Sequence, residues 1–376
     1  MNKITLKELS FENHKITFHK GLNYIIGANN TGKTTMYNMI QFVLGIKKEI
    51  NMSLKRHNFS TPVSLLCNIG EQEVLFERHF NSEYLNIQYG ITNEYVKHMS
   101  LRLKEVYDIL FEPFFVLEKE DGAAYEILKH SFLSESRFDV SRGRNEIFKK
   151  ILGINVLYMK QANKDYNDLK IKVDKEKNSI ELLETFIHRV LDKNNKLNTN
   201  DSVKFKDLLE NEYKLEKENY ITNYEFLHTA KQAIIRNEEY LDEYFDKRVS
   251  LIEPYYLDFI AYFSIGYNII DFRDFYKSNH NQKAILSGSI FYITLLCFMI
   301  ALNRSGYDEK HNGCGLLISD LSLYELDFNS QRNLEKLLRQ ESQSGMLQFV
   351  EFTGKQTKEL SADSIVFDLN SVERFL

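Results

Sequence analysis

Residues 27–35, Gly-Ala-Asn-Asn-Thr-Gly-Lys-Thr-Thr, have the spacing G-x-x-x-x-G-K-[ST] of a phosphate-binding loop. In this pattern backbone N–H groups curl around the phosphates, the lysine reaches the β and γ phosphates, and the first hydroxyl binds Mg²⁺. The pattern therefore predicts ATP and Mg²⁺ as cofactors. The residues it nominates for ATP are Gly27, Asn29, Asn30, Gly32, Lys33, Thr34 and Thr35, with Thr34 also on the metal.

The segments on either side of the loop agree with this prediction. Before it, the apolar run 22–26 predicts a buried parallel strand; after it, apolar residues at helical spacing from Met36 to Leu44 predict a helix. A strand, a glycine loop and the N-terminus of a helix together form an anion site. The alternative, a chance match in a Gly/Asn-rich turn, does not explain these flanks. Further strands are expected at 3–9, 15–19, 63–69, 73–76 and 84–89.

The amino-acid composition limits the classes of protein to which the chain can belong. The chain has 376 residues, 43% of them hydrophobic, which is enough for a sizeable core, and its net charge of −5 gives no overall basic excess for DNA. Its cysteines are Cys67, Cys297 and Cys314, with no C-x-x-C pair, which favours the reducing cytoplasm. The longest apolar run, 290–302, is too short to cross a bilayer, so no membrane partner is expected.

Residues 155–250 predict an antiparallel coiled-coil arm. A three-four spacing places these residues on one seam: Ala162, Tyr166, Leu169, Val173, Ile180, Leu183, Ile187 and Val190, with Glu176 as a polar interruption. After the polar stretch 192–201 a second seam contains Tyr213, Tyr220, Tyr224, Leu227, Ile234, Leu241 and Phe245. The alternative is a pair of ordinary core helices, because this second seam also includes Lys231 and Glu238.

Three motifs follow the arm. Leu286-Ser287-Gly288-Ser289 opens an apolar helix, for which a plain Ser/Gly helix cap is the alternative reading. Residues 315–319 predict a buried strand that ends in Asp320, and Asp327 lies seven residues further on. We expect the carboxylate of Asp320 to bind Mg²⁺ together with Thr34.

In this order the loop, arm, Ser287-Gly288 signature, Asp320 strand and Asp327 resemble the SMC-like branch of the ABC-type ATPases. The segment 145–154 and the position of the arm add to the resemblance. It implies an α/β P-loop head split by the arm into an N-terminal lobe, 1–154, and a C-terminal lobe, 251–376. It also implies that two heads close on ATP, with Ser287, Gly288 and Asp327 contacting nucleotide held by the opposite head.

The sequence departs from the family at positions that serve hydrolysis. Leu321 stands where the family has the water-polarising glutamate, and Gly354 follows the strand expected at 347–353, where a histidine is usual. In the segment 114–120, Glu118 or Lys119 replaces the usual glutamine. Glu325 could substitute only by displacing Asp327 from its position. Because such groups supply most of the catalysis in phosphoryl transfer, we expect impaired hydrolysis and assign no catalytic residue.

Two functions remain open. The first is an ATP-gated clamp or sensor, a homodimer or hetero-oligomer that controls the engagement of DNA or of an effector protein in DNA repair or antiviral defence. The second is a slow DNA-dependent ATPase motor in repair, with an unrecognised catalytic carboxylate. A transporter ATPase is disfavoured by the arm, and the partner rests on family analogy alone.

Overall fold

The computed structural model describes residues 3–50, 61–111, 123–134, 156–194, 200–263, 288–308, 313–320, 328–354 and 362–371. Its residues form two compact units. The head unit comprises Met1–Ile154 and Phe245–Leu376, and the arm unit comprises Asn155–Tyr244.

The first sheet of the head unit is antiparallel and six-stranded, in the order β2-β1-β4-β5-β6-β7. Its strands are β1 (Ile4–Phe11), β2 (His14–Thr17), β4 (Val63–Ile69), β5 (Gln72–Arg78), β6 (Tyr84–Tyr89) and β7 (Thr92–Lys97). Buried and half-buried residues alternate along β4, so one face of the sheet is covered. The five strands expected here from the sequence are confirmed, and β7 is an addition.

The second sheet is parallel and five-stranded, in the order β11-β3-β10-β9-β8. Its strands are β3 (Leu22–Ile26), β8 (Phe132–Ser134), β9 (Leu316–Asp320), β10 (Gln348–Thr353) and β11 (Ile365–Asp368). Every residue of β3 is buried, as expected for a central parallel strand. Strand β11, which was not predicted from the sequence, follows β10 and pairs with β3.

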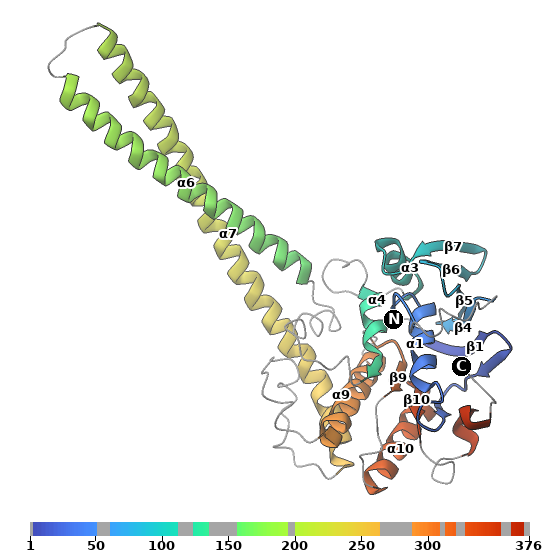
Figure 1. Ribbon diagram of the computed structural model, residues 1–376. Helices are drawn as coiled ribbons and strands as arrows, with labels where there is room; N and C mark the ends of the chain where they lie inside the picture. The colour runs from blue at the N-terminus through green and yellow to red at the C-terminus, as the bar shows by residue number, and fades with distance from the viewer. Residues whose placement is uncertain are drawn as a thin grey trace. The chain divides into compact units, whose positions relative to one another are not determined.

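Helix α1 (Lys33–Val43) contacts strands of both sheets and joins them into one core (Figure 1). Other helices of the head unit are α3 (Leu101–Phe111), α4 (Ala123–His130), α9 (Gly288–Asp308) and α10 (Phe328–Gln343), with short 3₁₀ turns η4 (Ala362–Ser364) and η5 (Leu369–Ser371). Cys67, Cys297 and Cys314 are buried free thiols. Among the described residues, no helix is both long enough and apolar enough to cross a membrane.

The arm unit is a hairpin of two long helices, α6 (Val156–Asn194) and α7 (Asn200–Ala261), the second of which continues into the head unit. Hydrogen bonds pair residue 184 with 213 and residue 176 with 223, so the helices are antiparallel. The described residues expected on the α6 seam are all buried or half-buried, while most of their neighbours are exposed. The first seam is therefore confirmed as far as Ile187.

The second seam needs a correction of one residue. Tyr224 is 52% exposed, and Lys231 and Glu238 are also exposed. From Tyr220 to Asn237, the half-buried residues are instead those at positions 220, 223, 227, 230, 234 and 237. Asn223, Ala230 and Asn237 therefore lie on the seam. Steps of three and four alternate in both registers, so the spacing alone does not choose between them, and burial places the seam at Asn223 and each seventh residue after it. The charged residues that favoured a pair of core helices are thus not in the seam.

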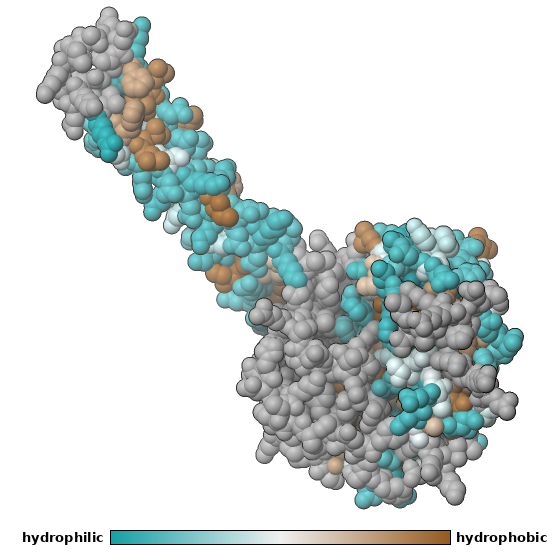
Figure 2. Space-filling model, viewed as in Figure 1, coloured by the Kyte–Doolittle hydropathy of each residue, from teal (hydrophilic) through white to brown (hydrophobic). Residues whose placement is uncertain are grey.

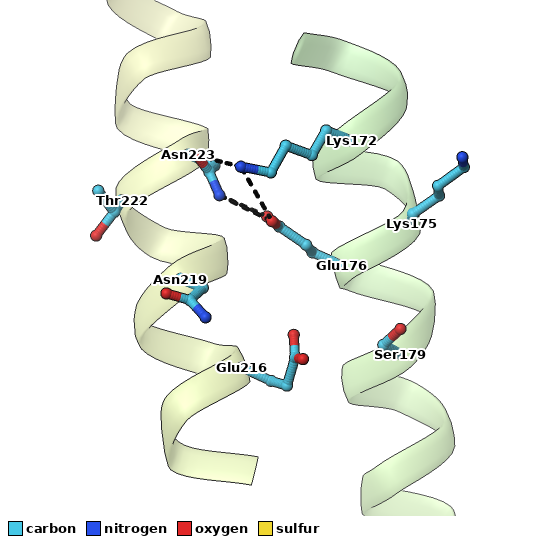
Figure 3. A pocket seen from close by; sticks show the side chains of 8 residues that line it. All are labelled: Lys172, Lys175, Glu176, Ser179, Glu216, Asn219, Thr222 and Asn223. Atoms are coloured by element: carbon cyan, nitrogen blue, oxygen red, sulfur yellow. Dashed lines mark hydrogen bonds and ion pairs between the residues drawn. The ribbon is translucent and has the colours of Figure 1, made fainter. Parts of the chain in front are cut away.

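A polar layer crosses the arm at residues 172, 176 and 223 (Figure 3). The Asn223 amide nitrogen donates to both carboxylate oxygens of Glu176, at 2.8 and 3.0 Å. The Lys172 ammonium lies 3.9 Å from Glu176 Oε1 and donates to Asn223 Oδ1 at 3.4 Å. Polar groups paired across a seam favour one register of the two helices over others.

Hydrophobic side chains are also exposed along the arm, and Figure 2 shows them gathered on one side near its tip. Leu182, Phe186 and Leu208 are 72%, 48% and 66% exposed, respectively. They lie outside the seam between α6 and α7.

Candidate functional site

The phosphate loop connects β3 to α1 at the carboxyl end of the parallel sheet. Asn30 and Gly32 adopt left-handed backbone conformations, with φ of 65° and 101°. Glycine adopts this conformation freely, and asparagine tolerates it better than most residues do. Gly32 is the N-cap residue of α1 and brings no side chain to the helix terminus, so the N–H groups of the first turn are left for an anion.

Lys33 folds back over the loop. Its ammonium donates to the carbonyl oxygens of Gly27 and Ala28, both at 2.7 Å. Burial lowers the pKa of Lys33, and the negative charge of Asp320 acts in the opposite direction. The charge of Asp320 is therefore felt at Lys33 although the two residues are 287 positions apart, so the predicted phosphate-binding lysine and the predicted metal ligand lie in one region of the head.

Asp320 reaches this region because β9 lies beside β10, which lies beside β3. All three strands run in the same direction, so Ile26, Thr353 and Asp320 end at one edge of the sheet. Ligands of open α/β sheets bind outside the carboxyl ends of the strands, which is this edge. Asp320 itself is half-buried.

The remaining loop residues are accessible. Asn29, Asn30 and Thr34 are exposed, and Thr35 is half-buried. The hydroxyl of Thr31 donates to Ala28 O at 2.8 Å and narrows the turn. Gly354 follows β10 directly and is half-buried. The loop, Asp320 and Gly354 thus all lie at the carboxyl ends of the parallel strands.

Gly27 is required by close packing. A Cβ atom at this position would lie 2.4 Å from Thr31 Oγ1 and 2.8 Å from Leu369 Cβ. The first contact is within the loop, and the second is with η5 near the C-terminus. Any side chain at residue 27 would therefore displace either the loop or η5.

Several expected residues lie outside the described part of the chain. They are Leu286, Ser287, Leu321, Glu325 and Asp327, and the segments 114–120 and 145–154. Gly288 is the first residue of α9. The signature serine and the Leu321 substitution thus remain predictions from the sequence.

The turn at residues 368–371 contacts the loop and was not predicted from the sequence. Asn370 Oδ1 accepts a hydrogen bond from the backbone N–H of Ala28 at 2.8 Å. A signal was present, because Asp368-Leu-Asn370-Ser371 is a group of turn-forming residues after the apolar strand 365–367. Nothing local, however, indicates that this turn meets residue 28.

Comparisons with known proteins agree with this arrangement. Residues 9–248 match the AAA domain family. Among solved structures, the chain resembles the Smc head domain of Pyrococcus furiosus, with an extended coiled coil and bound to the C-terminal domain of ScpA, at 15% identity and a TM-score of 0.52. That match covers 94% of this chain and 90% of the other. The search of curated proteins gives no match.

The comparison also matches the Smc head domain of Pyrococcus yayanosii with a coiled coil and joint, at 14% identity and a TM-score of 0.48, covering 94% of this chain and 92% of the other. The match to the Pyrococcus furiosus structure shows the fold. The α/β head with a coiled-coil hairpin that the sequence predicted is confirmed.

Proposed function

The chain belongs to the AAA domain family, and on that premise we propose that it is an ATP-binding SMC-like clamp or sensor with weak or absent intrinsic hydrolysis. Its head, residues 1–154 and 251–376, binds ATP. Closure of two heads on ATP repositions the arm, residues 155–250, and the arm transmits this movement to a partner. Buried free thiols suit the reducing cytoplasm as its compartment.

The observation that carries the proposal is that the loop leading to Lys33 and the end of β9 at Asp320 lie at the same carboxyl edge of the parallel sheet. The left-handed residues Asn30 and Gly32 and the uncapped start of α1 fit a phosphate group. Lys33 would bind the phosphates, and Thr34 and Asp320 would hold Mg²⁺. The metal would neutralise phosphate charge, and these residues would bind and orient the nucleotide.

Weak hydrolysis follows from the groups at the two positions that serve it in the family. Leu321 has no atom that can accept a proton from water, and Gly354 has no side chain to contact the γ-phosphate. Positioning and charge stabilisation are then incomplete, which costs orders of magnitude in rate. A head of this kind stays closed on ATP for long periods, which suits a clamp better than a motor.

Closure would place Ser287, Gly288 and Asp327 against nucleotide on a second head, in a homodimer or with a different partner chain. The Pyrococcus furiosus Smc head was solved with a protein bound, and an effector protein or DNA is the partner class that we propose here. Such a clamp suits a small DNA repair or antiviral defence module, in which the partner acts and this chain controls it.

Three measurements on the purified full-length chain test the function: ATP affinity by calorimetry, ATP turnover, and mass by light scattering with and without ATP. Lys33→Ala is the blank, because it removes the charge that meets the phosphates. We expect ATP binding that Lys33→Ala abolishes, an ATP-dependent increase in mass, and turnover far below the ~10 s⁻¹ of an ordinary enzyme. Unchanged ATP affinity in Lys33→Ala contradicts the site. Turnover near ~10 s⁻¹ contradicts the clamp and favours the alternative of an ATPase motor.

A further inference from the structure

We propose that Asn370 is a positioning residue for the phosphate loop, a role that deepens the proposed ATP site and rests on it. Its side-chain oxygen accepts the Ala28 N–H at 2.8 Å, although the two residues are 342 positions apart. This bond fixes the first turn of the loop, so that the later N–H groups keep the orientation that a phosphate needs.

The orientation of the Asn370 amide is determined by its neighbour. Asp368 Oδ1 accepts from the Asn370 side-chain nitrogen at 3.0 Å and from the Asn370 backbone N–H at 2.9 Å. An ionised carboxylate can only accept hydrogen bonds, so the NH₂ group of Asn370 must face Asp368. The oxygen of the same amide then faces Ala28, where a donor is required.

The loop is held from both neighbouring strands. β3 lies between β10 and β11 in the parallel sheet. On the β10 side, the Gly27 N–H donates to Thr353 O at 3.2 Å; on the β11 side, the Ala28 N–H donates to Asn370. Leu369, which is 2% exposed, packs where a Cβ of Gly27 would lie. Two consecutive residues are therefore fixed from two sides, Gly27 by strand β10 and Ala28 by the η5 turn that follows β11.

These contacts divide the loop into two parts. The N–H groups of Gly27 and Ala28 bond to protein acceptors, and their carbonyl oxygens accept the Lys33 ammonium. Phosphate would then bind the later N–H groups of the loop and the first turn of α1. Without Asn370, the Ala28 N–H loses its acceptor, and the Gly27–Ala28 peptide is held only through the Gly27 carbonyl oxygen that accepts the Lys33 ammonium.

The test compares Asn370→Ala with Asn333→Ala in the full-length chain. Asn333 is a matched control, because its side chain also forms one hydrogen bond to the backbone, donating to the carbonyl of Tyr262 at 2.7 Å. Affinity is measured by titration with a fluorescent ATP analogue and Mg²⁺. We expect about fivefold weaker binding for Asn370→Ala, the effect of one hydrogen bond, and no change for Asn333→Ala.

A second readout needs no nucleotide. Hydrogen exchange of a peptide covering residues 27–33 should be faster in Asn370→Ala than in wild type, while Asn333→Ala leaves it unchanged. A role limited to general stability would instead lower the melting temperature of both variants and leave this peptide no faster than the rest of the head. That result overturns the proposal.

The double variant Asp368→Asn with Asn370→Asp supplies a partial rescue at unchanged net charge. One carboxylate oxygen at position 370 still accepts the Ala28 N–H, and the other accepts from the amide at position 368. The amide nitrogen then takes the place of Asp368 Oδ1, which in wild type also accepts the backbone N–H of residue 370, so that bond is lost. We expect this double variant to bind ATP more tightly than Asn370→Asp alone, in which two carboxylates are adjacent. A double variant that binds no tighter than Asn370→Asp overturns the proposal.

The outcomes separate the two proposals. If wild type binds no ATP, the proposed function fails, while hydrogen exchange still tests the Asn370 contact. If wild type binds ATP and Asn370→Ala binds it equally well, only the positioning role fails.

Discussion

The guanidinium carbon of Arg78 lies 3.9 Å from the centre of the Phe42 ring. From there Arg78 Nη1 donates to the carbonyl oxygens of Phe42 and Lys47, and Nη2 donates to that of Lys48. Burial lowers the pKa of Arg78 to about 10, so it remains charged at neutral pH. A cation from β5 thus caps the C-terminal end of α1, where the helix dipole favours positive charge. The same helix begins at the phosphate loop.

Arg78→Met should lower the free energy of unfolding by about 3 kcal/mol, because the buried Arg78 side chain donates hydrogen bonds to three backbone carbonyl oxygens at the C-terminal end of α1 and methionine donates none. Chemical denaturation of the full-length chain measures this loss. Arg102→Met is the control: Arg102 forms ion pairs with Glu94 and Glu105 at the surface, and its loss should change stability by less than about 1 kcal/mol. If both variants lose the same free energy of unfolding, the hydrogen bonds of Arg78 at the end of α1 contribute no more to stability than a surface ion pair.

Asp320→Asn should weaken ATP binding about tenfold in Mg²⁺ and leave it unchanged in EDTA, because only the metal needs the carboxylate. Titration with a fluorescent ATP analogue in the two buffers gives the comparison. Asp363→Asn, an exposed carboxylate on η4, should have no effect in either buffer. The same loss with and without Mg²⁺ would rule out Asp320 as a metal ligand.

Ser287→Arg should abolish ATP-dependent association while leaving ATP affinity unchanged. The signature serine serves nucleotide on another head in this family, and an arginine would block that contact by its size. Light scattering with and without ATP measures association, and Lys33→Ala should lose both properties. Should Ser287→Arg dimerise normally, residues 286–289 are a simple helix cap.

Asn223→Leu should lower the free energy of local opening of the arm helices by about 1 kcal/mol, because the half-buried Glu176 carboxylate loses two hydrogen bonds. Hydrogen exchange of α6 and α7 in the full-length chain measures the change. The double variant Glu176→Leu with Asn223→Leu should recover wild-type protection or exceed it, since an apolar pair replaces the polar one. If the double variant shows less protection than Asn223→Leu or Glu176→Leu alone, the Glu176–Asn223 pair does not account for the stability of the polar layer.

Lys3 should make stability depend on pH in the alkaline range. Burial lowers the pKa of Lys3 to about 8, compared with 10.5 in the unfolded chain. Between these values the unfolded state holds a proton that the folded state has lost, so this group raises stability as pH increases. The difference in unfolding free energy between wild type and Lys3→Met, from denaturation at a series of pH values between about 8 and 10.5, should therefore increase with pH. A constant difference would contradict the lowered pKa.

Local patterns in the sequence were enough for much of the fold. A strand at 22–26, a phosphate loop at 27–35 and a helix after it were each predicted from a short-range pattern. The three predictions support one another, because the loop motif requires a strand before it and a helix after it. The α6 seam could be read from Ala162 to Ile187 for the same reason: its apolar residues alone define the spacing. In α7 the seam contains Asn223 and Asn237, so the apolar tyrosine at 224 led to the wrong register.

The sequence by itself determined that this chain has a phosphate loop, a carboxylate at the end of a buried strand and a coiled-coil arm. Only the tertiary structure decided which distant residues complete the site. Parallel strands bring Asp320 and Thr353 to the loop because their carboxyl ends meet at one edge, and β11 brings Asn370 to Ala28 from 342 positions away. Strand order is set by packing of the whole core, and no local pattern encodes it.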